Sequence, residues 1–383
     1  MPDVQTGCPS GRGEHLGGVT NMLRRRALAL LSGALASLSL ACAGPAAAQG
    51  APFYAGKTIT VLVGVQAGGT VDTIVRRFAE FLKKQIPGNP NIIVQNMTGA
   101  GSNLVFNYFA EKAAPDGLTI AYSSYQALAQ ALGDSSLRAR FENFDYLGGV
   151  SDTRVSYMRS DAVPGGMRSP ADIAKAENLA VGTYSNTDFE GTLSHLSLDV
   201  LGVKHKRVIG YRGGADIFLA MQRGEVHFHN TSVGSFRTRS AAFIKSGEGM
   251  GVYYLVTADA NGQFEKNEFI TEMPAFPDLY KQIHGKAPSG KDWDALNWLT
   301  AQTSELAYAA FAPRGTSPEL LATLRMAFEN ASKDPDFIAQ SIATNGVPYH
   351  FVNAARGQAI IRSLADVSPD VIDALRASMN KPN

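Results

Sequence analysis

Residues 59–82 read ITVLVGVQAGGTVDTIVRRFAEFL, and this stretch decides the fold. The run at 59–65 is short, almost wholly apolar and rich in β-branched residues, which predicts a strand buried on both faces. Gly68-Gly69 then interrupts it. From Val71 onward the apolar residues recur at the spacing of one helix face. The stretch therefore predicts a strand, a glycine loop and a helix in succession.

This succession is suited to binding an anion. Thr70 stands at the N-cap position of the expected helix, and Asp72 lies in its first turn, where the helix dipole favours an acid. Glycines let the backbone approach a ligand, and the first N–H groups of a helix have no partner inside it. Together these groups form a site for a carboxylate or another anion. The alternative is a tight βα connection that holds no ligand.

Length and composition indicate an ordinary globular protein of two domains. The chain has 383 residues, of which 45% are hydrophobic and 18% charged. The formal net charge of +1 provides no basic field, so we expect no nucleic-acid partner.

Residues 1–48 are expected to be a leader. A basic segment at 22–26 precedes an apolar run at 27–41 that is too short for a membrane span, and Ala46-Ala47-Ala48 satisfies the cleavage rule. We therefore expect a signal peptide at 22–48, removal of the leader and a periplasmic location. A retained membrane anchor is the alternative, and Met22 is the expected translation start.

Both cysteines, Cys8 and Cys42, precede the expected cut, so the mature chain has no disulfide and no thiol ligand for a metal. Lipoprotein anchoring at Cys42 is an alternative. Removal of residues 1–48 leaves 31 basic against 32 acidic residues, a balance of −1.

Strands and helices alternate along the rest of the chain, which predicts parallel, doubly wound sheets. Further strands are expected at 91–95, 118–122, 179–183, 207–211, 226–230, 251–256 and 306–312. In such sheets ligands bind beyond the carboxyl ends of the strands.

Two domains are expected. We assign residues 49–151 and 258–383 to domain 1 and residues 152–257 to domain 2, with a two-crossing hinge near Ser151 and Thr257. Residues 259–297 are polar and contain three prolines, so they are expected to be irregular. Helices are expected at 335–344, 353–365 and 368–379, where they return to domain 1.

Seven motifs follow one another between Lys57 and Asn383. They are Gly68-Gly69-Thr70-Val71-Asp72, Asn96-Met97-Thr98-Gly99-Ala100-Gly101, Ala114-Pro115-Asp116-Gly117-Leu118-Thr119, Ser194-His195-Leu196, Tyr211-Arg212-Gly213, Arg223-Gly224-Glu225-Val226 and Ala312-Pro313-Arg314-Gly315-Thr316-Ser317-Pro318. This series resembles the motifs of the tripartite tricarboxylate transporter receptors, the Bug family of periplasmic solute-binding proteins.

The resemblance implies a type II periplasmic-binding-protein fold, in which two α/β domains close on a small carboxylate and present it to two integral membrane transporter subunits. It also implies a monomer without catalysis, metal or cofactor. The loops at 66–72 and 183–192 would hold the ligand, largely through backbone N–H groups. The expected ligand-binding residues are Gln66, Ala67, Gly68, Gly69, Thr70, Asp72, Ser123, Ser124, Thr183, Tyr184, Ser185, Asn186, Thr187, Asp188, Tyr211 and Arg212.

The sequence departs from the family pattern in three places. Val65-Gln66 replaces a common Pro-Phe pair, and His227 stands where Asp is common. Asp188 and Glu190 replace small polar residues in the second loop. Two carboxylates near an anion site oppose binding unless they are paired or turned away, and we expect Arg212 to pair with one of them. Otherwise they bind hydroxyl or amino groups of the ligand.

Several further motifs allow other chemistry. His227-x-His229 places two imidazoles on one strand face, either as a metal pair or as packing. Ser194-His195 suggests a hydrolase dyad, although neighbouring helical residues do not face each other. Tyr125, Tyr184 and Tyr211 either stack on a ligand or pack in the core.

Three functions are therefore compared. The first is a periplasmic receptor for a small organic acid. The second is a hydrolase on the same fold that uses His195 or Asp188. The third is a ligand-sensing subunit that hands its loaded form to a signalling partner.

Overall fold

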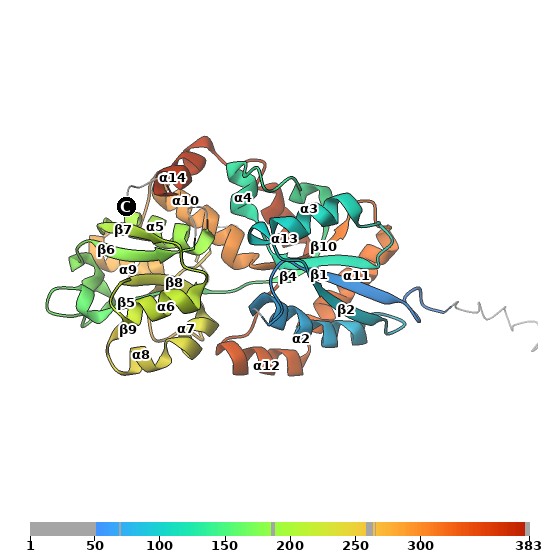
Figure 1. The fold of residues 1–383 in the computed structure, drawn as a ribbon, viewed down its shortest axis with the longest axis horizontal. Coiled ribbons are helices and arrows are strands. Elements are labelled where there is room, and N and C mark those ends of the chain that lie inside the picture. Colours follow the sequence, from blue (N-terminus) through green and yellow to red (C-terminus); the bar gives the residue numbers. More distant parts are fainter. Residues whose placement is uncertain (1–50, 69, 185–187, 258–262, 265, 380–383) are drawn as a thin grey trace, which may run out of the picture. The chain divides into compact units, whose positions relative to one another are not determined.

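The computed structural model describes residues 51–379, with the exception of 69, 185–187, 258–262 and 265. The expected leader therefore lies outside the described residues. Two mixed sheets carry the fold of the described part (Figure 1). The strand order is β11-β4-β10-β3-β1-β2 in the first sheet and β7-β6-β8-β5-β9 in the second.

The first sheet combines strands that are far apart in the sequence. It contains β1 (Thr58–Val63), β2 (Asn91–Asn96), β3 (Thr119–Ser124), β4 (Phe144–Val150), β10 (Tyr308–Pro313) and β11 (Phe351–Val352). β1 pairs in parallel with β2 and β3, whereas β10 lies antiparallel between β3 and β4. β11 pairs antiparallel with β4 at the edge.

Helices cover both faces of this sheet. The helices around it are α2 (Thr70–Gln85), α3 (Asn103–Lys112), α4 (Ala127–Leu132), α11 (Pro318–Ser332), α12 (Pro335–Asn345) and α13 (Ala354–Arg362). α2, α11 and α12 share one core with the sheet, in which Phe78 lies against Phe328 and Phe337. α3 and α13 contribute to a second core that includes Phe106 and Phe311.

The second sheet is built in the same way. Its strands are β5 (Arg154–Arg159), β6 (Leu179–Thr183), β7 (His205–Ile209), β8 (Phe228–Ser232) and β9 (Gly249–Tyr254). Its helices are α5 (Phe189–Leu201), α6 (Gly214–Gln222), α7 (Val233–Arg239), α8 (Ala241–Lys245), α9 (Phe276–His284), α10 (Lys291–Thr300) and α14 (Pro369–Met379). One core contains residues of α5, α9, α10 and α14, and another contains residues of α6, α7 and α8.

Short helical turns complete the described elements. The 3₁₀ turns are η1 (Ala100–Ser102), η2 (Phe141–Asn143), η3 (Ser160–Ala162) and η4 (Pro170–Lys175), and η5 (Ala301–Glu305) is a π-helical turn.

The predicted strand and helix at 59–82 are confirmed as β1 and α2. The predicted α/β class is also confirmed, but the sheets are mixed and not purely parallel. β10 is the reason in the first sheet, because it enters antiparallel between β3 and β4. In the second sheet, β5 pairs antiparallel with β8 and β9. The predicted parallel sheets are therefore wrong in this respect.

The prediction of irregular structure at 259–297 is wrong, because this range contains α9 and most of α10. Pro277 lies in the first turn of α9, where its missing N–H costs nothing. Leu279 on α9 and Leu296 on α10 are buried in the core beside α5. Burial of these apolar faces stabilises α9 and α10. The many polar residues between the apolar ones made the helical spacing hard to see in the sequence.

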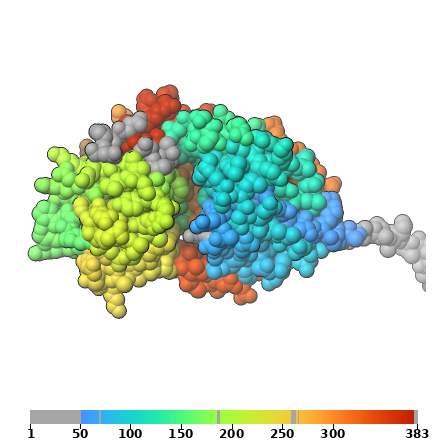
Figure 2. Space-filling view, viewed as in Figure 1, coloured from blue at the N-terminus to red at the C-terminus, as the bar shows by residue number. Residues whose placement is uncertain are grey.

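The C-terminal part of the chain serves both sheets. We predicted that residues 258–383 complete domain 1, but α9, α10 and α14 contribute to the core beside α5. The chain rejoins the first sheet only at β10, after η5, and leaves it again between α13 and α14. The space-filling view shows orange and red residues of the C-terminal part beside both the green-yellow and the blue parts of the chain (Figure 2). The exact domain boundaries stay a prediction.

Among the described residues, no helix combines the length and the apolar character needed to cross a membrane.

The contribution of α10 to the core can be tested with Leu296→Ala. Leu296 is 1% exposed, so we expect its truncation to lower the free energy of unfolding by about 2–5 kcal/mol. Leu219→Ala is the matched control, because Leu219 is 49% exposed, and its effect should stay within about 0.5 kcal/mol. Urea unfolding measures both variants. Equal effects would contradict the packing described here.

Candidate functional site

The loop between β1 and α2 is fixed by the carboxylate of Asp72. This side chain is buried, and its Oδ2 accepts hydrogen bonds from the Gly68 backbone N–H at 2.8 Å and from Arg76 Nε at 3.0 Å. Its Oδ1 accepts a hydrogen bond from Asn96 Nδ2 at 2.7 Å, and Asn96 also donates to the Val65 carbonyl. The first helix turn thus holds the glycine loop that precedes it.

Electrostatics favours the charged form of this carboxyl. Burial alone would raise the pKa of Asp72, but the hydrogen bonds from Arg76, Gly68 and Asn96, together with the charge of Arg76, hold it below its ordinary value. Asp72 is therefore ionised at neutral pH. In this structure it is a positioning group for the loop.

Asp188, the N-cap of α5, holds the described residues on either side of 185–187. Its Oδ1 accepts a hydrogen bond from the Gly191 N–H at 2.6 Å, and its Oδ2 accepts one from the Tyr184 N–H at 3.2 Å. The predicted acid at this position is thus turned toward the backbone of its own helix. The chain's own carboxylate thereby occupies N–H groups that would otherwise bind an external anion.

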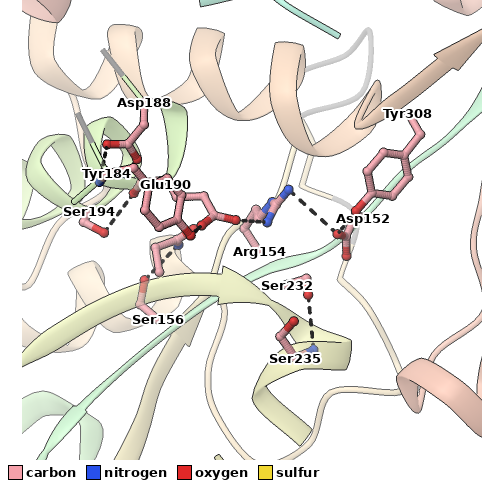
Figure 3. A network of polar contacts seen from close by, with 12 residues as sticks. Asp152, Arg154, Ser156, Tyr184, Asp188, Glu190, Ser194, Ser232, Ser235 and Tyr308 are labelled. Atoms are coloured by element: carbon pink, nitrogen blue, oxygen red, sulfur yellow. Dashed lines mark hydrogen bonds and ion pairs between the residues drawn. The ribbon is translucent and has the colours of Figure 1, made fainter. Parts of the chain in front are cut away.

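A buried polar chain connects this loop to the hinge (Figure 3). Arg154 Nη1 donates to Glu190 Oε1 at 2.8 Å, and Arg154 Nη2 lies 3.8 Å from Asp152 Oδ2. Tyr308 Oη donates to Asp152 at 3.1 Å, and Tyr184 Oη donates to the other oxygen of Glu190. The chain therefore runs from β10 through the start of β5 to the first turn of α5.

The charges in this chain depend on one another. Burial alone would lower the pKa of Arg154, but the carboxylates of Asp152 and Glu190 raise it. Burial raises the pKa of Asp152, although Arg154 and the Tyr308 hydroxyl oppose this shift. Burial and the nearby Glu190 charge also raise the pKa of Tyr184, so its hydroxyl stays protonated.

The expected pairing of Arg212 with Asp188 or Glu190 is wrong. The Arg212 side chain is 89% exposed, and its Nε donates to Asp216 at 2.8 Å, four residues along the same helix start. Arg154 pairs with Glu190 instead. Sequence analysis missed Arg154. Its one indication in the sequence is a cation at the first position of a strand whose other residues are mostly suited to burial.

Other expected residues lie at the carboxyl ends of adjacent parallel strands. Ser123 is fully buried at the end of β3, where its Oγ accepts a hydrogen bond from the Gly64 N–H next to β1. Thr183 is fully buried at the end of β6, and its carbonyl accepts a hydrogen bond from the Tyr211 N–H after β7. Each sheet thus gathers its own set of expected residues at one edge.

The remaining expected residues differ in exposure. Gln66, Ala67 and Gly68 are exposed, whereas Ser124 and Tyr211 are partly buried. Gly69 and residues 185–187, namely Ser185, Asn186 and Thr187, lie outside the described residues, as does the side chain of Thr70. Whether these residues bind a ligand stays a prediction.

A cavity of about 500 Å³ lies at the hinge. It is lined by residues 151–153 of one crossing, by residues 254–257 after β9, and by residues of η5 and β11. None of the expected ligand-binding residues that the structure describes lines it. The cavity therefore belongs to the segments that join the sheets and not to the two βα loops.

The alternative motifs find structural explanations. Ser194 Oγ donates to the Glu190 carbonyl at 2.9 Å, and the fully buried ring of His195 lies 4.8 Å from that of His205. His227 Nδ1 accepts a hydrogen bond from the Ala180 N–H. Tyr125 is buried against Phe141.

Metal-ligating side chains are not clustered in the described part of the chain. Its histidine, aspartate and glutamate side chains form no group of three or more that could hold a metal ion.

The chain was compared with known proteins. No protein-family model matches it. It is 25% identical over 308 residues to the UPF0065 protein encoded in the TAR-I ttuE–ttuC′ intergenic region of Agrobacterium vitis, which covers 79% of this chain and 80% of the relative. A UPF0065 protein of Bordetella pertussis is also 25% identical, over 305 residues, 78% of this chain and 83% of the relative.

Solved structures share the fold along most of the chain. A TctC solute-binding protein from Polaromonas matches with a TM-score of 0.60 and 18% identity over 84% of this chain and 98% of its own. The periplasmic binding protein BugD matches with a TM-score of 0.57 and 16% identity over 84% and 97%. The predicted resemblance to the Bug family is confirmed. MatC from Rhodopseudomonas palustris, solved with bound malate, matches with a TM-score of 0.54 and 18% identity over 85% and 99%.

Asp72→Asn tests how the first loop is fixed. The lost charge should cost about 1–3 kcal/mol of unfolding free energy at pH 7. Because the folded-state pKa of Asp72 is lowered, its contribution is present above the unfolded pKa and is lost as pH falls through the folded pKa. The difference from the parent chain should therefore shrink below about pH 4. Asp366→Asn, at an exposed carboxylate, is the control in the same urea series.

Arg154→Gln tests the buried pair. Removal of the cation leaves Asp152 and Glu190 without their counter-charge, so we expect a loss of about 3–5 kcal/mol in unfolding free energy. Arg223→Gln carries the same charge change at an exposed pair with Glu225 and should cost less than about 1 kcal/mol. Denaturant unfolding of both variants at pH 7 measures the difference. Similar losses would refute a central role for Arg154.

Proposed function

We propose that the mature chain is a periplasmic receptor that captures a small organic acid by closure of its two domains. It delivers this acid to two integral membrane subunits of a tripartite tricarboxylate-type transporter. It acts as a monomer, without catalysis, metal or cofactor. Its relatives in the Bug family and MatC, which was solved with malate, support this class of function and ligand.

The observation that carries the proposal is the pair of βα loops held by carboxylates of their own helices. Asp72 accepts a hydrogen bond from Gly68 before α2, and Asp188 accepts hydrogen bonds from Tyr184 and Gly191 at the start of α5. Each loop stands at the carboxyl end of a strand, where open α/β sheets bind ligands. Groups that are already held in place, such as the Gly68, Tyr184 and Gly191 backbones, lose little conformational entropy on binding, which favours affinity for a small ligand.

The proposed mechanism is a population shift between open and closed forms. A ligand that contacts both domains binds the closed form better and therefore favours it. Bending takes place at residues 151–153 and at the later crossings beside the hinge cavity. The polar chain from Tyr308 to Glu190 links this region to the second loop.

The buried contacts of Ser194 and His195 support a binding role over a hydrolytic one. Ser194 Oγ donates to a backbone carbonyl, and His195 packs inside α5 against the second core. These two side chains do not form a nucleophile and base pair directed at a substrate.

The direct test is a thermal-shift screen of residues 49–383 against mono-, di- and tricarboxylates, amino acids and neutral sugars. A ligand at about 100 times its dissociation constant adds roughly 2.7 kcal/mol to stability. This should raise the melting temperature by several degrees. We expect shifts with acids and a stoichiometry of one per chain by calorimetry.

Two outcomes would overturn the proposal. One is a screen in which no acid shifts the melting temperature although amino acids or sugars do. The other is turnover of a bound acid that disappears in His195→Ala.

A further inference from the structure

Three polar side chains converge on Gly214, the first residue of α6. A Cβ atom at this position would lie 3.3 Å from Arg239 Nη1, 3.4 Å from Tyr184 Oη and 3.6 Å from His229 Nε2. These groups come from the end of α7, the loop after β6 and strand β8. Because Gly214 has no side chain, the space above its Cα is open to all three.

Arg239 has no counter-charge in the described part of the chain. No hydrogen bond or ion pair joins its exposed guanidinium to a described residue, whereas Arg212, Arg223 and Arg237 each pair with a nearby carboxylate. Glu190, which accepts a hydrogen bond from Tyr184, pairs with Arg154 and not with Arg239. Arg239 is therefore a cation beside this cluster that has no paired carboxylate among the described residues.

The buried ring of His229 is the second indication that a ligand binds beside Gly214. Its side chain is 2% exposed, and its Nε2 has no hydrogen-bond partner among the described residues. A buried polar atom without a partner costs about 1–3 kcal/mol, so such atoms are rare and require an explanation. Burial lowers the pKa of His229 to about 4, against the opposing effect of Glu190, so the ring is neutral at physiological pH. A neutral ring can donate one hydrogen bond from Nε2.

The helix itself adds donors. α6 has nine residues, and its N-cap, Gly213, offers no side-chain cap. The first amide groups of a helix lack partners within it and carry partial positive charge. At α5, by contrast, Asp188 already occupies the N–H of Gly191. In the second sheet the N-terminus of α6, and not that of α5, is therefore open to an external anion.

We propose that Arg239, His229 Nε2 and the first amide groups of α6 form a subsite for the second anionic group of an organic acid. The first anionic group binds at the glycine loop before α2. This inference rests on the proposed function and deepens it, because it assigns the charge recognition in the second domain to α6 and α7. Arg239 is then the residue that separates acids with two anionic groups from acids with one.

The test compares straight-chain acids of equal length by calorimetry. Succinate, glutarate and adipate are matched with butyrate, pentanoate and hexanoate, against the mature chain and its variants. We expect the parent chain to prefer the tightest diacid over its matched monoacid at least tenfold. Arg239→Gln should reduce this ratio about tenfold while monoacid affinity changes less than twofold. Arg223→Gln, with the same charge change at an exposed position of the second domain, should leave the ratio unchanged.

Gly214→Ala provides a second variant that fills the subsite with a methyl group and preserves all charges. It should lower diacid affinity about tenfold at unchanged melting temperature of the free protein. A parent chain that binds acids without preferring diacids would overturn the subsite and leave the receptor function standing. Arg239→Gln with an unchanged ratio, or with equal losses for both acid types, would also overturn it. A chain that binds no acid would overturn both proposals.

Discussion

The buried guanidinium of Arg154 is the interaction on which the arrangement of the second domain depends. A charge removed from water is costly unless it is paired and its donors are satisfied. Arg154 is paired with Asp152 at the hinge and with Glu190 in the first turn of α5, whereas its buried Nε has no hydrogen-bond partner among the described residues. The guanidinium of Arg154 also lies over the ring of Phe189, with 4.7 Å between its central carbon and the ring centroid. The start of β5, the hinge and the helix that opens the second loop are thus held in one geometry.

Local sequence patterns predicted where strands and helices lie better than they predicted whether neighbouring strands run parallel or antiparallel. The apolar spacing of residues 59–82 was sufficient for β1 and α2, because each buries one continuous set of side chains. The antiparallel insertion of β10 between β3 and β4 was not predictable in this way, since strand direction depends on contacts about 160 positions or more apart along the chain. α9 and α10 were missed because Pro277 and several aspartates lie in their first turns, while Leu279 and Leu296 carry the packing.

In the candidate site, too, contacts between residues close in the sequence were easier to predict than contacts between distant residues. Asp72 could be placed at a helix start from the sequence, because capping is a local rule, whereas Asp188 was expected in the second loop and not as a helix cap. Their actual partners, the backbone N–H groups of their own loops, are also local. The partner of Glu190 was not predictable, because Arg154 lies 36 positions away and reaches it only after the second sheet has formed. The convergence of Arg239, Tyr184 and His229 on Gly214 depends on three separate elements and has no signature in sequence.

The return of α14 to the second core has a mechanical consequence. Three stretches of chain, at 151–153, at η5 and between α13 and α14, pass between the two sheets. A body tethered at a single point can rotate in any direction, and one tethered at two points can still twist about the line that joins them. Three separate tethers restrict both sliding and twist more than one or two would. In the proposed closure, each movement would therefore bring the same faces together, and a ligand would meet a fixed geometry.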